Sequence, residues 1–206
     1  MTDSADRLES DVPADPAAGA SSPAPPTPRQ LALRDAVRDI ERHMAARGWD
    51  GPIGVFALVR TADAVAATPA LAEELPEGTL AVAQEDPEHL TSIEQDGLPQ
   101  AETVEELLAQ LGWPEQVDGA AVVLERIIVP PEAEQGLPDD PHEALDALMA
   151  HPERQDVRMA AGVLRTGESW CALRTRANDN DDAVGGSPDA VPGLVAALRA
   201  TLQTES

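Results

Sequence analysis

The sequence predicts an α+β fold, with an antiparallel or mixed sheet of about five strands and helices mainly on one face. Three observations support this class. Apolar residues have helical spacing near both ends of the chain, at residues 28–47 and 188–203. Two strand-like runs, 156–165 and 169–176, are separated by a connection short enough for a hairpin. Helices and strands alternate in the first half, which permits a parallel pair and leaves the mixed sheet open.

The helix predicted over residues 28–47 has the clearest signals. Thr27 suits the N-cap, and Pro28 suits the first helical position. The apolar residues that follow recur every three or four positions, and Gly48 is a residue type that often ends a helix. These apolar residues are Leu33, Val37, Ile40 and Met44.

The middle of the chain is predicted to contain short helices and strands in alternation. In order, we expect a strand at 55–59, helices at 61–67 and 68–75, a strand at 80–84, a polar connection at 85–101, a helix at 103–111 and a strand at 119–130. An acidic loop at 131–140 and a helix at 140–150 precede the hairpin, and a polar loop at 177–188 follows it. Within the connection at 85–101, residues 93–99 are either a segment that docks a partner or a loop that tucks Leu98 under the sheet.

Length and composition predict one folded domain, residues 29–206, after a tail. Residues 1–28 contain six Pro with Ala, Ser and several acids, and no apolar period. Such a segment buries too little apolar surface to offset its ordering entropy, so we expect a disordered tail. The single Cys excludes an internal disulfide framework. No signal-like start and no 18-residue apolar run is visible, so we expect a cytoplasmic protein.

Charge is distributed very unevenly along the chain. The net charge is −24, and residues 61–156 hold 23 Asp and Glu against two Arg. Such a field repels nucleic acid and anionic membranes and attracts basic partners. We therefore expect a non-enzymatic acidic interaction protein, chaperone-like or adaptor-like, with a basic protein partner and with neither nucleic acid nor membrane as a partner. The sequence leaves the oligomeric state open.

Motifs for catalysis are lacking. Nothing matches a nucleophile elbow, a P-loop or a dinucleotide-binding glycine turn. Cys171 lies in an apolar strand-like run, the four His are scattered, and the acidic run at 178–182 does not fit the register of a calcium-binding loop. We expect no catalytic residue, no metal and no cofactor, which weighs against an enzyme.

Arginines at strand ends suggest one alternative function. Strand periodicity sends alternate side chains to opposite faces, so arginines from neighbouring strands can converge on one sheet surface and bind a carboxylate or phosphate. The alternative is therefore a binder of a small anionic ligand, or an enzyme, with an arginine-lined sheet face. In the opposing interpretation each arginine pairs with one of the protein's own abundant acids. The four residues are Arg60, Arg126, Arg165 and Arg174.

Several short motifs, taken in order, resemble a family of uncharacterised actinobacterial proteins of Propionibacterium type. The resemblance covers about residues 29–203 and implies a cytoplasmic α+β domain and a high-GC actinobacterial source. It implies no activity and no catalytic residues. The motifs are Trp49-Asp50-x-Pro52, Phe56-Ala57-Leu58-Val59-Arg60-Thr61, Glu94-Gln95-Asp96-x-Leu98-Pro99, Trp113-Pro114, Val123-Leu124-Glu125-Arg126, Ala161-Gly162-Val163-Leu164-Arg165, Cys171-Ala172-Leu173-Arg174 and Val191-Pro192-x-Leu194-Val195.

Overall fold

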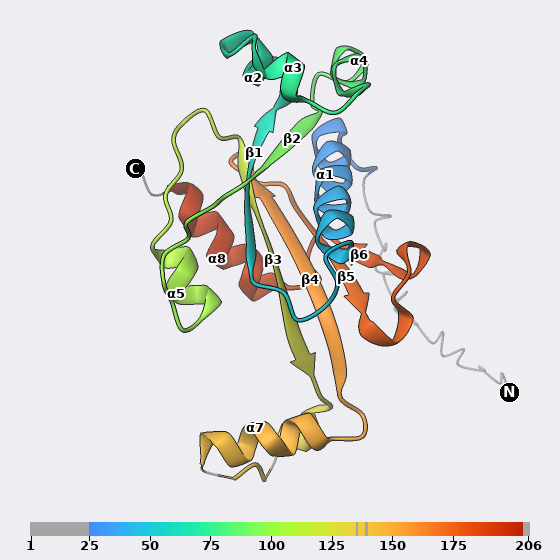
Figure 1. The fold of residues 1–206 in the computed structure, drawn as a ribbon, viewed down its shortest axis with the longest axis vertical. Coiled ribbons are helices and arrows are strands. Elements are labelled where there is room, and N and C mark those ends of the chain that lie inside the picture. The colour runs from blue at the N-terminus through green and yellow to red at the C-terminus, as the bar shows by residue number, and fades with distance from the viewer. Residues whose placement is uncertain (1–24, 135, 139, 204–206) are drawn as a thin grey trace, which may run out of the picture.

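A six-stranded antiparallel sheet forms the centre of the protein (Figure 1). The computed structural model describes residues 25–134, 136–138 and 140–203. The order across the sheet is β2-β1-β3-β4-β5-β6, and every neighbouring pair is antiparallel. The α+β class and the antiparallel sheet are therefore confirmed. The strands are β1 (Gly54–Arg60), β2 (Leu90–Glu94), β3 (Gly119–Ile128), β4 (Gln155–Leu164), β5 (Ser169–Thr175) and β6 (Gly185–Ser187).

Eight α-helices accompany the sheet within the described residues. The capping predicted for the first helix is present, because the Thr27 side chain accepts a hydrogen bond from the Gln30 amide and Pro28 begins the helix. The predicted tail lies outside the described residues up to residue 24. The helices are α1 (Pro28–Ala45), α2 (Thr61–Ala67), α3 (Leu71–Glu74), α4 (Thr79–Glu85), α5 (Val104–Ala109), α6 (Pro131–Glu134), α7 (Pro141–Ala150) and α8 (Pro192–Gln203), with two 3₁₀ turns at Arg176–Asn178 and Asp181–Ala183.

Helices cover both faces of the sheet, so the expectation that they lie mainly on one face is wrong. Helix α1 packs on one face, and α5 and α8 pack on the other (Figure 1). The reason lies in the central strands, where residues 54–58 of β1 and 119–124 of β3 are buried without alternation. A strand that is apolar on both sides needs cover on both sides.

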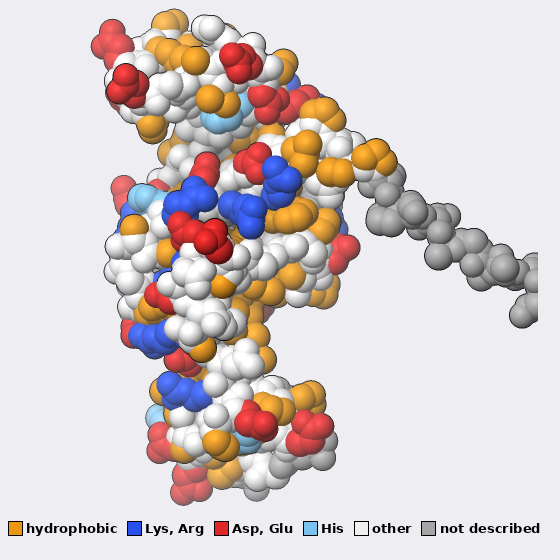
Figure 2. Space-filling view, turned by 90° about the vertical axis from the view of Figure 1, so that its right-hand side faces the viewer, with side chains coloured by type: hydrophobic (Ala, Val, Ile, Leu, Met, Phe, Trp, Pro, Cys, Tyr) orange, Lys and Arg blue, Asp and Glu red, His pale blue; other side chains and the backbone are white. Residues whose placement is uncertain are grey.

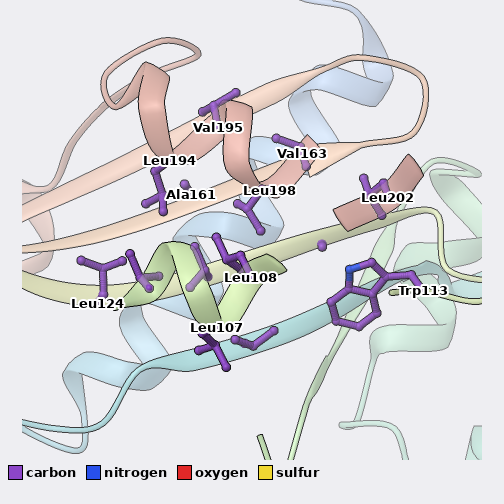
Figure 3. Close-up of a cluster of buried hydrophobic side chains, with 14 of the residues drawn as sticks. Leu107, Leu108, Trp113, Leu124, Ala161, Val163, Leu194, Val195, Leu198 and Leu202 are labelled. Carbon is purple, nitrogen blue, oxygen red and sulfur yellow. The ribbon is translucent and has the colours of Figure 1, made fainter. Parts of the chain in front are cut away.

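The face under α5 and α8 holds the larger apolar cluster (Figure 3). Trp113 precedes β3 and packs at the edge of this cluster, where its indole Nε1 donates to Thr201 Oγ1 of α8 at 2.9 Å. Leu98 also packs against the cluster, so residues 93–99 tuck this side chain inward. The side chains labelled in Figure 3 are Leu107, Leu108, Trp113, Leu124, Ala161, Val163, Leu194, Val195, Leu198 and Leu202.

Helix α1 approaches the opposite face unusually closely at β4. Gly162 makes this possible, because a Cβ on it would lie 2.5 Å from Cγ2 of Val37. Val37 is fully buried, and its neighbours on α1 pack against Phe56 and Leu58 of β1. The residue type at position 162 therefore sets how near the helix lies to the sheet.

The strand predicted at 80–84 is wrong, because this segment is helix α4 and the strand lies at 90–94 instead. Ala81, Ala83 and Gln84 favour a helix over residues 80–84, whereas Leu90, Thr91 and Ile93 suit a strand. Strand β2 extends the sheet beside β1, and Thr91 lies opposite Val59. Pro87 and Gly97, which favoured a connection over 85–101, flank β2 and do not interrupt it.

Two parts of the molecule project beyond the layered centre (Figure 1). The helical lobe, residues 61–89, contains α2, α3 and α4 at one end. The distal arm, residues 125–157, lies at the other end and consists of the far ends of β3 and β4 with α6 and α7 between them. Strand β1 stops pairing with β3 at Val123, and β5 stops pairing with β4 at Val157, so the arm is a two-stranded ribbon beyond the Arg126–Val157 pair.

Candidate interaction site

The structure brings together two of the four predicted arginines, Arg60 and Arg165. Arg60 forms ion pairs with Asp63 at 2.6 Å and Asp118 at 3.2 Å. Arg165 donates to backbone carbonyl oxygens, including that of Val117 at 2.8 Å. Both guanidinium groups line one pocket of about 110 Å³, but Asp118 lies in it as well. A second anion would have to displace acceptors that already bind these groups.

The other two predicted arginines lie apart from that pocket and from each other. Arg126 points to the α5 side of the sheet, where it lies 3.6 Å from Glu105. Arg174 lies on the opposite side, under α1, and donates to both carboxylate oxygens of Glu41. The four arginines therefore do not form one cluster, and the sheet has no face lined by all of them.

A buried ion network was not anticipated from the sequence. Glu41 of α1 is 1% exposed and lies between Arg174 of β5 and Arg158 of β4, which are 3% and 2% exposed. Its carboxylate accepts from Arg174 at 2.7 and 2.8 Å and lies 3.8 Å from Arg158. Hydrogen bonding to Glu41 is the largest cause of the raised pKa of the Arg174 guanidinium, and a hydrogen bond to Asp181 raises it further. The network joins the helix to two strands.

Arg158 extends the network to the loop between α1 and β1. It donates to Glu125 at 2.7 Å and to the carbonyl oxygen of Gly48. Its guanidinium carbon lies 4.4 Å from the ring centre of Trp49, and Arg176 approaches the same ring at 5.3 Å. Nη1 of Arg158 is buried and has no hydrogen-bond partner among the described residues. These contacts hold a loop against the sheet and leave no free reactive group.

The pocket beside this network offers no excess of either charge. Its volume is about 290 Å³, and it lies between α1 and the 3₁₀ turn at 181–183. Three arginines and three carboxylates line it, so a charged ligand would meet its own sign as often as the opposite one. The lining side chains are Arg38, Arg42, Arg174, Glu41, Asp181, Asp182 and Val184.

Groups for covalent or metal chemistry are equally scarce in the described part of the chain. Cys171 is fully buried, and this burial raises the pKa of its thiol. Among the side chains that the structure describes, no three from His, Cys, Asp or Glu lie together in a way that could hold a metal ion. None of the described helices has the length and apolar character needed to cross a membrane.

Much of the acidic block of the sequence lies at the two opposite ends of the molecule. Figure 2 shows arginines gathered over the middle of one face with carboxylates among them, and further carboxylates toward both ends. Ten of the thirteen arginines in the described residues pair with carboxylates of this chain. Exposed carboxylates that form no ion pair within the described residues include Glu73, Glu74, Glu77 and Glu85 in the lobe, and Glu132, Asp140, Glu143, Asp146 and Glu153 in the arm. Asp96, Glu102, Glu106, Glu115, Asp182 and Asp189 are further such carboxylates, outside both parts.

The distal arm also exposes most of the large apolar side chains at the surface. Six such side chains are exposed among the described residues, and four belong to the arm: Ile127, Ile128, Leu145 and Met149. Residues 129–156 contain eight acids and one arginine. That arginine, Arg154, donates to the Met149 carbonyl oxygen at 2.6 Å and ties the end of α7 to β4. The arm therefore combines exposed apolar side chains with negatively charged residues around them.

A groove of about 200 Å³ lies at the base of this surface. Ile127 of β3 and Met149 of α7 contribute its apolar walls. Asp50, from the loop after α1, lies at its rim and binds Arg176 at 2.5 Å, a contact that lowers the pKa of the Asp50 carboxyl. Asp156 forms part of the groove and is only 19% exposed at its side chain. Sequence reasoning missed this groove, because its parts come from five separate segments of the chain.

The fold and this site define a class of protein: an acidic α+β protein with an open antiparallel sheet and a projecting, apolar-tipped arm. Comparison with protein families is more specific. The model of the PPA1309-like protein family matches residues 33–203, and the chain belongs to this family. The resemblance noted in the sequence is thus confirmed at the level of the family. No curated protein and no solved structure matches the chain.

Proposed function

We propose that this protein is a non-enzymatic acidic interaction protein that binds a basic protein partner in the cytoplasm. The observation that carries the proposal is the division of charge. Arginines are mostly bound by internal carboxylates, whereas the helical lobe and the distal arm carry exposed carboxylates without ion-pair partners in the described residues. An unpaired field of one sign steers partners of the opposite sign.

Two further observations support binding rather than chemistry. The pocket that holds Arg60 and Arg165 already contains a carboxylate, and the pocket beside Arg174 has balanced charge. Large apolar side chains next to the exposed acids supply the desolvated contacts that charge alone does not provide. A chaperone-like or adaptor-like role requires both kinds of surface.

Salt-dependent capture tests this proposal. The full chain is immobilised, exposed to a lysate of the cell that carries its gene, and eluted with a salt gradient. We expect basic proteins to be retained at low ionic strength and released as salt screens the attraction, with the Debye length falling to about 8 Å near 0.15 M.

A variant that neutralises both acidic ends is the control. It combines Gln or Asn substitutions at exposed carboxylates that form no ion pair in the described residues, so the fold should persist. We expect it to lose the salt-sensitive proteins. The same proteins retained by both chains, or an absence of any salt-sensitive protein, would contradict the proposal. The substitutions are Glu73→Gln, Glu74→Gln, Glu77→Gln, Glu132→Gln, Glu143→Gln and Asp146→Asn.

A further inference from the structure

We infer that the distal arm is the docking surface and that its occupant is a basic amphipathic helix of the partner protein. This inference rests on the proposed function and deepens it, because it selects one of the two acidic ends. The helical lobe exposes carboxylates but only Val82 among its large apolar side chains. The arm has both components.

The apolar side chains of the arm are arranged to receive a helix. Leu145 and Met149 are 53% and 44% exposed and lie four residues apart, which places them on one face of α7. Met149 also lines the groove whose other apolar wall is Ile127. A ridge along α7 that continues into a groove matches the way in which a second helix packs, with its own apolar residues three and four positions apart.

Charge around these side chains selects the sign of the occupant. Asp146 follows Leu145 on α7 and lies three residues before Met149, so it flanks the apolar ridge, whereas Glu143 lies on another side of the helix. Both carboxylates are exposed without an ion pair in the described residues. Asp50 is 74% exposed at the groove rim. Lysine or arginine residues that flank the apolar stripe of a partner helix would lie against these carboxylates. Three arginines line the groove, and each already lies near a carboxylate of this chain: Arg154 and Arg176 pair with Asp156, and Arg126 lies 3.6 Å from Glu105.

Like charge argues against a second copy of this chain as the occupant. Two arms placed face to face would bring together two segments that each hold nine acids and two arginines. Anionic lipid meets the same repulsion. A basic amphipathic helix is the occupant that matches both the exposed apolar side chains of the arm and its negative charge.

The test uses the full-length chain and two synthetic peptides of about 18 residues with Leu at helical spacing. One carries Lys at the remaining positions, and the other carries Glu. Methyl NMR reports the location of binding, because the chain has only five Ile and four Met. We expect the Lys peptide to shift the Ile127 and Met149 methyl signals and to leave Ile93 on β2 and Met44 on α1 unchanged. The Glu peptide should shift none of them.

Matched variants then measure the contribution of the arm by fluorescence anisotropy of the labelled Lys peptide. Leu145→Ser with Met149→Ser should weaken binding by about tenfold or more, because two half-exposed apolar side chains lose their burial. Val82→Ser on α4, a side chain that is 48% exposed, should change binding less than about twofold. Both variants alter only exposed residues, and circular dichroism verifies their folding.

The possible outcomes separate this inference from the proposed function. Binding that shifts the Ile93 or Met44 signals instead of those of the arm, or that is equally strong in the Leu145→Ser, Met149→Ser variant, overturns the arm as the site and leaves the interaction protein standing. A chain that binds neither the Lys peptide nor any salt-sensitive protein overturns both. Arm signals that shift with protein concentration alone would identify a second copy as the occupant and overturn the basic helix.

Discussion

The ion network under α1 makes a quantitative prediction about Glu41. Replacing it by Gln keeps the shape of the side chain but removes the charge that lies between two buried guanidinium groups. Two charge-assisted hydrogen bonds from Arg174, at 2.7 and 2.8 Å, are affected, and an amide can retain only one as an acceptor. Breaking a buried pair from one side costs about 3–5 kcal/mol. Arg174 keeps the exposed acceptors Asp179 and Asp181, so we expect the lower end, about 3 kcal/mol.

The assay is urea unfolding at neutral pH followed by far-ultraviolet circular dichroism, which avoids the fluorescence of Trp49 beside the network. The free energy of unfolding should fall while its dependence on urea is unchanged. Glu88→Gln is the matched control, since Glu88 pairs with Arg29 at the surface and its loss should cost less than about 1 kcal/mol.

A double variant tests whether the cost comes from an orphaned charge. In Glu41→Met, Arg174→Met the whole pair becomes apolar, and Arg158 keeps Glu125. We expect this variant to be more stable than Glu41→Gln, because no guanidinium is left without its main counterion. A Glu41→Gln cost no larger than that of Glu88→Gln would refute the reasoning. A double variant less stable than Glu41→Gln would refute it too.

Two further predictions concern packing and pH. Gly162→Ala should destabilise the fold by about 1–3 kcal/mol, since its methyl group would lie 2.5 Å from a Val37 methyl, whereas Gly185→Ala in open space should be neutral in the same urea assay. Arg29 lowers the pKa of Glu88, so this pair stabilises the fold above about pH 4, and the contribution is lost as the pH falls through the lowered value. Glu88→Gln should therefore lose less stability than the unaltered chain between neutral and acidic pH in thermal unfolding; an equal loss would contradict the assignment.

The sequence correctly predicted those elements whose conformation is determined by residues close together in the chain. Thr27 and Pro28 specify the start of α1, and the short Thr166-Gly167-Glu168 connection specifies the β4–β5 hairpin. Strand β2 was missed because it is five residues long, with only Leu90 and Ile93 apolar, and therefore lacks the alternation of apolar and polar residues that indicates a strand. Its strand conformation depends on β1, whose free edge accepts it, and that partner is distant in the sequence.

The buried network was missed although the hairpin contained a signal for it. A hairpin centred on residue 166 places Arg158 opposite Arg174. Two like charges in directly opposed positions destabilise a sheet unless an acid reaches both. The covering helix had to supply this acid, and Glu41 is the one that does. The reasoning about strand ends selected Arg174 but passed over Arg158, because Arg158 lies within its strand and not at the end.

The contiguous acidic block in the sequence is not a contiguous face in the structure, and this difference changes how salt should act. Chain segments that leave the sheet at opposite ends of its strands carry much of the block into the lobe and the arm (Figure 1). The ion pairs that hold the fold, such as Glu41 with Arg174, are buried and little screened. The carboxylates available to partners are exposed, so added salt screens their attraction to a partner. Added salt should thus release a partner at concentrations that leave the fold intact, which distinguishes screening of an interface from loss of structure.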